Sequence, residues 1–68
     1  MLLHYISIVE SPYNSSAWYG IASGKGVIRQ GYIQIEEAQQ TAKKAHAVPY
    51  KREIKPELYE TLYRWTTE

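Results

Sequence analysis

Few side chains of this sequence have the type and spacing that catalysis or ligand binding requires, and Ser23-Gly24-Lys25-Gly26 comes closest to a known pattern. Glycine beside lysine is typical of loops that hold phosphate through backbone amides. Such a loop opens a helix and carries serine or threonine directly after the lysine. Here glycine follows Lys25, and strand-like segments stand on both sides. The segment therefore predicts a tight hairpin turn.

The other reactive residue types are also poorly placed for catalysis or metal binding. His4 and His46 are the only histidines, neither has the spacing of a metal ligand, and cysteine is absent. A zinc site needs about four ligands. Glu36 and Glu37 are adjacent on a predicted helix, where neighbouring side chains point about 100° apart, so they cannot face each other as an acid–base pair. We therefore predict a non-enzyme without metal or cofactor.

The aromatic residues are the strongest functional signal, because the chain has seven tyrosines and two tryptophans but no phenylalanine. Tyrosine and tryptophan are favoured where one end of a side chain is apolar and the other is wet, as in interface cores. The alternative is that a small domain leaves most side chains half exposed and tolerates tyrosine everywhere. The core of so small a domain cannot bury all six of the following aromatic side chains: Tyr13, Trp18, Tyr19, Tyr32, Tyr59 and Tyr63. We predict an exposed aromatic patch that binds a partner.

Positive charge is concentrated in one segment. The chain has a net charge of +1, but residues 43–55 carry five basic residues against Glu53 alone, a local net charge of +4. These residues could follow a phosphate backbone with Tyr50 as a stacking ring. The alternative is a solvated helix end followed by a charged edge strand.

Aromatic and basic residues together form the predicted contact set for a macromolecular partner. Aromatic anchors are typical of the energetically dominant positions of interfaces, and basic residues add electrostatic complementarity. The predicted set is Trp18, Tyr19, Tyr32 and Tyr50, with Lys44, Lys51, Arg52 and Arg64.

The elements that must position these residues follow from hydrophobic periodicity and turn residues. Residues 1–68 are expected to form a single α+β domain. Leu2 to Glu10 alternates as a strand, and residues 17–23 and 27–34 form two further strands around the glycine turn. Ile35 to Ala47 is a helix with acidic residues first and basic residues last, and its apolar stripe is Ile35, Ala38, Ala42 and Ala45.

The C-terminal third is expected to add one strand and one helix. Tyr50 to Lys55 alternates as a short edge strand, and Pro56 suits the first position of a second helix. Leu58, Leu62 and Trp65 recur at helical spacing in that segment. The predicted fold is a small antiparallel three- or four-stranded sheet packed by one helix, with a short C-terminal helix, in the order β-β-β-α-β-α.

The sequence carries no sign of export or membrane insertion. The apolar start lacks a basic flank and a cleavage site, and no apolar run approaches the roughly 18 residues that cross a bilayer. We expect a soluble cytoplasmic protein without a membrane partner.

The pattern of residues 3 to 54, from "YISIVE" through "AWYGIA" to "GKGVIRQGYIQIEEAQQTAKKA", resembles the strand-strand-strand-helix layout of HicB-like antitoxin domains. Gln30-Gly31 and Glu36-Glu37-Ala38 match in kind, although the segment between them is longer here. The layout is also similar to small phage-encoded inhibitors, including anti-CRISPR proteins and an inhibitor of bacterial RNA polymerase. This resemblance implies a protein that occupies a functional surface of a host protein, in the host cytoplasm.

The expected function is therefore recognition without catalysis. A small inhibitor would bind a host protein or protein–nucleic-acid complex through its Tyr/Trp and basic surface. The alternative is a small nucleic-acid-binding regulator that uses residues 43–55. A homodimer is compatible with both, because pairing would bury the surplus aromatic rings.

Overall fold

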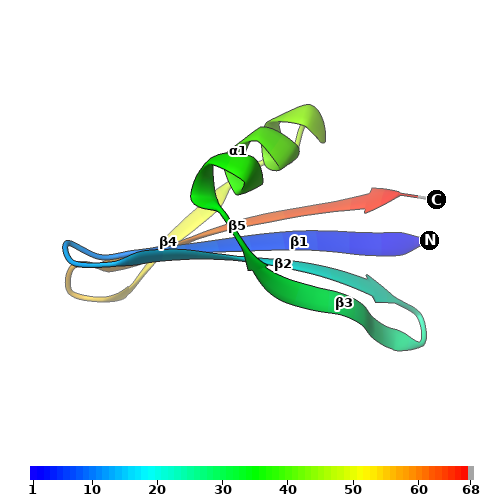
Figure 1. Ribbon diagram of the computed structural model, residues 1–68, viewed down its shortest axis with the longest axis horizontal. Coiled ribbons are helices and arrows are strands. Elements are labelled where there is room, and N and C mark those ends of the chain that lie inside the picture. Colours follow the sequence, from blue (N-terminus) through cyan, green and yellow to red (C-terminus); the bar gives the residue numbers. More distant parts are fainter. Residues whose placement is uncertain (68) are drawn as a thin grey trace.

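Five antiparallel strands form one sheet, and a single helix lies across one of its faces (Figure 1). The computed structural model describes residues 1–67. The elements in chain order are β1 (Leu2–Glu10), β2 (Ser15–Ser23), β3 (Gly26–Ile33), α1 (Ile35–Lys44), β4 (Tyr50–Lys55) and β5 (Leu58–Thr67). The expected α+β class, with an antiparallel sheet packed by one helix, is confirmed.

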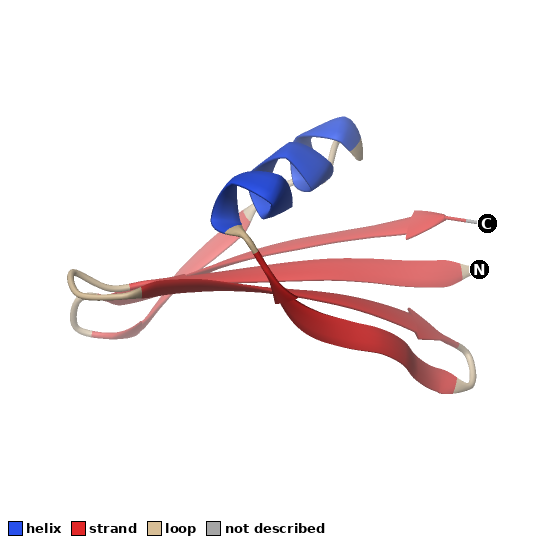
Figure 2. Ribbon diagram, in the orientation of Figure 1, coloured by secondary structure: helices blue, strands red, loops and turns tan. Residues whose placement is uncertain are grey.

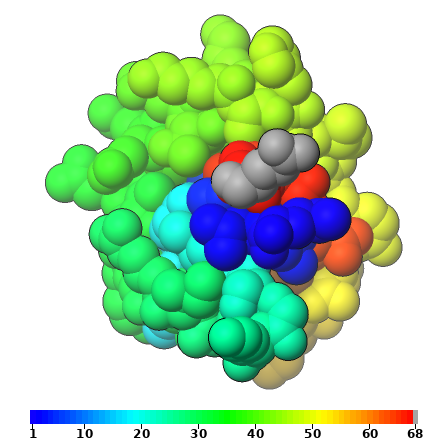
Figure 3. Space-filling model, turned by 90° about the vertical axis from the view of Figure 1, so that its right-hand side faces the viewer, coloured from blue at the N-terminus to red at the C-terminus, as the bar shows by residue number. Residues whose placement is uncertain are grey.

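The sheet has the strand order β3-β2-β1-β5-β4, so the first strand of the chain lies at its centre. The chain runs from β1 outward to one edge, crosses the sheet as α1 and returns through β4 at the other edge (Figure 2). Leu2 pairs with Thr67, which places the beginning of β1 beside the end of β5. Figure 3 views this end, with β1 in blue, β5 in red and the helix region above them.

The buried core lies between the sheet and the helix. Ile6 and Ile8 of β1 point towards α1, whose Ala38 and Ala42 are buried against the sheet together with Ala17 of β2. Alanine at these helix positions lets the backbone approach the sheet closely. Partly buried side chains complete this layer: Tyr19, Ile33, Ile35, Ala47, Tyr63 and Trp65.

The helix ends earlier than expected and has a defined C-terminal cap. Its last residue is Lys44, and His46 adopts a positive φ of 53°. The amide of His46 donates to the carbonyl of Lys43, and the amide of Ala47 donates to that of Ala42, each at 3.1 Å. This is the Schellman arrangement, with histidine where glycine is usual. Ala47 then packs against the core.

Each of the two hairpin turns at the outer strands contains one residue with positive φ. In the β2–β3 turn, Gly24 and Lys25 form the tip, and Gly26 adopts a φ of 115°. In the β4–β5 turn, Pro56 is followed by Glu57 with a φ of 66°. Proline followed by positive φ is typical of a type II turn. The expected hairpin at the glycine segment is confirmed.

The predicted C-terminal helix is wrong: residues 58–67 form β5, inserted between β1 and β4, and the sheet has five strands. Tyrosine, threonine and tryptophan suit a pleated surface. In β5 the side chains of Tyr63 and Trp65 pack on the core side, while Leu62 and Arg64 point to the other face. Pro56 begins a turn rather than a helix.

Candidate binding surface

The sheet face opposite α1 carries a row of side chains that crosses all five strands. Successive residues of a strand point to opposite faces, so the pairing register identifies the members of this row. Because Ile6 and Ile8 face the helix, Ser7 between them faces away. Its direct neighbours across the sheet complete the row, which reads Tyr32, Trp18, Ser7, Leu62 and Tyr50. We call the face that contains this row the open face.

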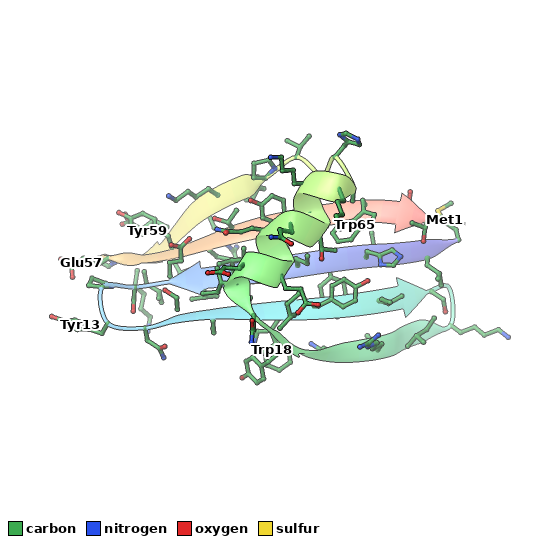
Figure 4. All side chains as sticks on the ribbon, turned by 45° about the horizontal axis from the view of Figure 1, so that its top comes forward. Met1, Tyr13, Trp18, Glu57, Tyr59 and Trp65 are labelled. Carbon is green, nitrogen blue, oxygen red and sulfur yellow. The ribbon has the colours of Figure 1, made fainter. Side chains whose placement is uncertain are left out.

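Trp18 and Tyr32 form an aromatic pair at one end of the row. Their ring centroids lie 4.0 Å apart with an interplanar angle of 49°. Trp18 is half-buried, whereas Tyr32 is 72% exposed. In Figure 4 the labelled Trp18 projects beyond the sheet away from the helix, whereas the labelled Trp65 lies on β5 beside the helix. The pair is an exposed aromatic cluster of the kind that contributes most to interfaces.

Tyr5 extends the open face along β1. Its ring covers Gly20 of β2 so closely that a β-carbon at that position would overlap the end of the phenol. Glycine inside a strand often marks such a close approach. Leu3 and Val9 lie on the same face as Tyr5 because they also alternate with the core residues of β1.

Polar groups on the open face are concentrated on β4 and β5. The hydroxyl of Ser7 donates to Oε2 of Glu60 at 2.7 Å, and Nε of Arg52 lies 2.9 Å from Oε1 of the same carboxylate. Arg64 lies directly across from Tyr5. The open face therefore combines aromatic rings on β1, β2, β3 and β4 with two guanidinium groups and one carboxylate.

The structure divides the eight predicted contact residues between two faces. Five of them share the open face: Trp18, Tyr32, Tyr50, Arg52 and Arg64. The other three lie elsewhere. Tyr19 packs against the core beneath the helix, Lys51 alternates to the helix side of β4, and Lys44 is in the last turn of α1. The set does not form one continuous surface.

Tyr19 belongs to a cluster on the helix side that also includes His4. The hydroxyl of Tyr19 lies 2.6 Å from Nδ1 of His4, and Oγ1 of Thr67 lies 2.8 Å from Nε2. The imidazole stacks on the Trp65 indole with centroids 5.2 Å apart and an interplanar angle of 8°. Both ring nitrogens therefore have hydrogen-bond partners, and the cluster connects β1, β2 and β5.

The basic residues of segment 43–55 do not line one track with Tyr50. Lys43 and Lys44 lie at the helix end, and all six residues of β4 are exposed. The Lys51 ammonium lies 5.2 Å from the Tyr59 ring centroid, on the face of β4 opposite to Tyr50. The alternation of β4 thus separates the stacking ring from Lys51.

Tyr59 also has an unusual environment at the β4–β5 hairpin. Glu53 lies directly across from it, accepts a hydrogen bond from its hydroxyl and raises the pKa of Tyr59 above the ordinary value of a phenol. The negative charge of the same carboxylate acts in the same direction, and slight desolvation adds to it. The pair stabilises the neutral phenol at an exposed position.

Tyr5 and Leu62 are two of the open-face residues that the predicted contact set does not include. Alternation along β1 puts Tyr5 on the face opposite Ile6, and this is the signal that could have included it. Leu62 was assigned to the apolar stripe of a helix that does not exist, so its neighbours across the sheet could not be inferred.

Comparisons with other proteins add no relative from which a role could be transferred. No protein-family model matches the sequence, and searches of curated proteins and of solved structures return no match. Within residues 1–67, the one helix is too short and too polar to cross a membrane.

Proposed function

We propose that this protein is a non-catalytic binding protein whose open face holds a protein partner, and that it blocks or modulates a host macromolecule in this way. The single observation that carries the proposal is the row from Tyr32 to Tyr50, which presents aromatic side chains on the sheet face opposite the helix. Tyr32 and Tyr50 are 72% and 63% exposed.

The composition of the open face favours a protein partner. Interface cores are enriched in tyrosine, tryptophan and arginine and depleted in lysine. The face contains Trp18 with tyrosines on β1, β3 and β4, and its cations are Arg52 and Arg64 rather than lysines. Arg52 already has Glu60 as a partner. A protein surface with apolar pockets and carboxylates at its rim would match these groups.

A nucleic-acid-binding regulator that uses residues 43–55 is the second candidate. Every residue of β4 is exposed, and Lys43 and Lys44 precede it at the helix end. This surface would bind through phosphate contacts, so its affinity would fall steeply as the salt concentration rises. An interface anchored by aromatic rings would depend on salt much less.

Affinity capture with matched variants tests the proposal. The tagged protein, Tyr32→Ala and the control Tyr13→Ala would each be incubated with host-cell lysate, with and without nuclease. Tyr13 is 94% exposed in the β1–β2 loop and lies outside the open face. The partner identified would then be purified and titrated against all three proteins at two salt concentrations.

We expect nuclease-resistant binding that Tyr32→Ala weakens at least tenfold and Tyr13→Ala leaves unchanged. Tenfold corresponds to about 1.4 kcal/mol, which is within the range for an aromatic anchor. Binding that disappears with nuclease would contradict the proposal and support the nucleic-acid-binding regulator. The same conclusion would follow if the double substitution Lys51→Glu and Lys55→Glu abolished binding while Tyr32→Ala did not.

A further inference from the structure

The molecule exposes more surface than a free-standing domain of its mass. Its accessible surface is 5286 Å². A compact monomer of 7.9 kDa has about 4,400 Å². The radius of gyration is 12.2 Å, where about 11 Å is usual for 68 residues. The surplus of about 900 Å² is close to the roughly 800 Å² that each partner buries in a standard interface.

The buried core is correspondingly small. Among residues 1–67, the only buried hydrophobic side chains larger than alanine are Ile6 and Ile8. The core of a domain of this size supplies only about 3–5 kcal/mol, and many small domains supplement it with a disulfide, a metal or oligomerisation. The chain has no cysteine, so a disulfide is excluded. The open face is an apolar area that association could bury, whereas on the other face α1 packs against β1 and β2.

We infer that a second copy of this chain covers the open face, and that the resulting dimer is the partner-free form of the protein. This inference rests on the proposed function, because the same face would then serve both the second copy and the partner. A partner would have to displace one copy in order to bind. A second copy is the occupant present wherever the protein is made, so it can complete the core before any partner is met.

The order of the strands makes the open face suited to two-fold pairing. Two sheets that pack face to face lie about 10 Å apart with strands aligned to within about 30°. A two-fold axis parallel to β1 would place β2 and β3 of one copy over β5 and β4 of the other. Trp18 and Tyr32 would then lie over Leu62 and Tyr50, with the small Ser7 residues nearest to the axis. The bulkier half of the row in one copy, Trp18 and Tyr32, thus packs against the less bulky half, Leu62 and Tyr50, in the other copy.

Sedimentation of the whole protein tests this arrangement from about 1 µM to about 1 mM, a range that covers weak and moderate dimers. The proteins compared would be the wild type, Tyr32→Arg, Tyr50→Arg and the control Tyr13→Arg. All three substituted residues are well exposed, so the monomer fold should persist, and circular dichroism would verify it.

We expect the wild type and Tyr13→Arg to approach twice the mass of 7.9 kDa, while Tyr32→Arg and Tyr50→Arg stay monomeric over at least a tenfold wider concentration range. A wild type that remains monomeric throughout would overturn the inference. Disruption by only one of the two tyrosine variants would also overturn it, because it would place the contact at one sheet edge. Species larger than a dimer would contradict a closed two-fold pair.

The two proposals fail in different ways. If the wild type is monomeric and Tyr32→Arg still weakens partner binding, the dimer inference is refuted and the proposed function stands. If Tyr32→Arg disrupts the dimer but leaves the affinity for the partner unchanged, the proposed function is refuted and the dimer inference stands.

Discussion

The Trp18 indole and the Tyr32 phenol pack against each other across β2 and β3, with ring centroids 4.0 Å apart, on the sheet face that the helix leaves uncovered. This contact separates two groups of aromatic residues. Tyr19, Tyr63 and Trp65 complete the core beneath α1, whereas Trp18 and Tyr32 contact each other on the open face. The aromatic surplus of the sequence is therefore partly structural and partly concentrated on one surface.

The coupling between Trp18 and Tyr32 can be measured by a double-mutant cycle with Trp18→Ala and Tyr32→Ala. We expect a coupling energy of about 0.5–1.5 kcal/mol, as for other aromatic pairs in contact. Urea denaturation at low protein concentration gives the four unfolding free energies. Strictly additive losses would mean that the contact contributes nothing to the monomer.

Gly20→Ala should destabilise the fold, because its β-carbon would occupy the position of the Tyr5 ring. We expect a loss of about 1–3 kcal/mol, typical of overpacking. Gly31→Ala is the matched control, since nothing lies within 4 Å of its β-carbon position. That control should gain roughly 0.5 kcal/mol, because alanine is favoured over glycine in a strand. Equal effects of the two substitutions in urea denaturation would contradict the close packing of Tyr5.

His46→Gly should stabilise the protein by about 1 kcal/mol, because glycine adopts positive φ without the steric cost that a β-carbon brings. Replacement of histidine also removes a side chain near the helix C-terminus. His46→Ala controls for that loss while keeping the backbone strain, and it should give no gain. Thermal unfolding of both variants checks the prediction. A gain with alanine equal to that with glycine would show that the backbone at residue 46 is not strained.

The raised pKa of Tyr59 predicts a pH dependence with a definite sign. The folded state favours the neutral phenol, so this contribution to stability is complete below the ordinary phenol pKa of about 10 and is lost as pH rises above it. Glu53→Gln should lower the pKa of Tyr59 and remove this part of the loss of stability at alkaline pH. Absorbance of the phenolate during an alkaline titration reports the change, and Glu57→Gln serves as the control. Titration curves that coincide for the wild type and both variants would contradict an interaction between Glu53 and Tyr59.

Most of the fold could be predicted from the sequence because local signals and tertiary packing agree there. β1 to β3 follow alternation and a glycine turn, and the alanine stripe of α1 lies where helical periodicity places it. The segment from Leu58 onwards carries two patterns at once. Leu58, Leu62 and Trp65 fit a helix, whereas the alternation of Tyr63 and Trp65 with Leu62 and Arg64 fits a strand.

Pairing with β1 decides between those two patterns, and a sequence alone does not show which strand will be adjacent. The same missing information limited the candidate site. Trp18 and Tyr32 were identified from residue type, but their alignment with Leu62 and Tyr50 depends on the position of β5 between β1 and β4. Tyr19 and Trp18 were predicted to share one contact surface on residue type, although adjacent residues of a strand necessarily point to opposite faces.

The two tryptophans make the most direct test of the open face as the contact surface, because Trp18 lies on that face and Trp65 packs beneath the helix. The indole N–H signals of ¹⁵N-labelled protein would be followed by nuclear magnetic resonance while the captured partner is added. We predict that the Trp18 signal shifts or broadens in proportion to the bound fraction and that the Trp65 signal stays in place. A shift of Trp65 with Trp18 unchanged would contradict the account.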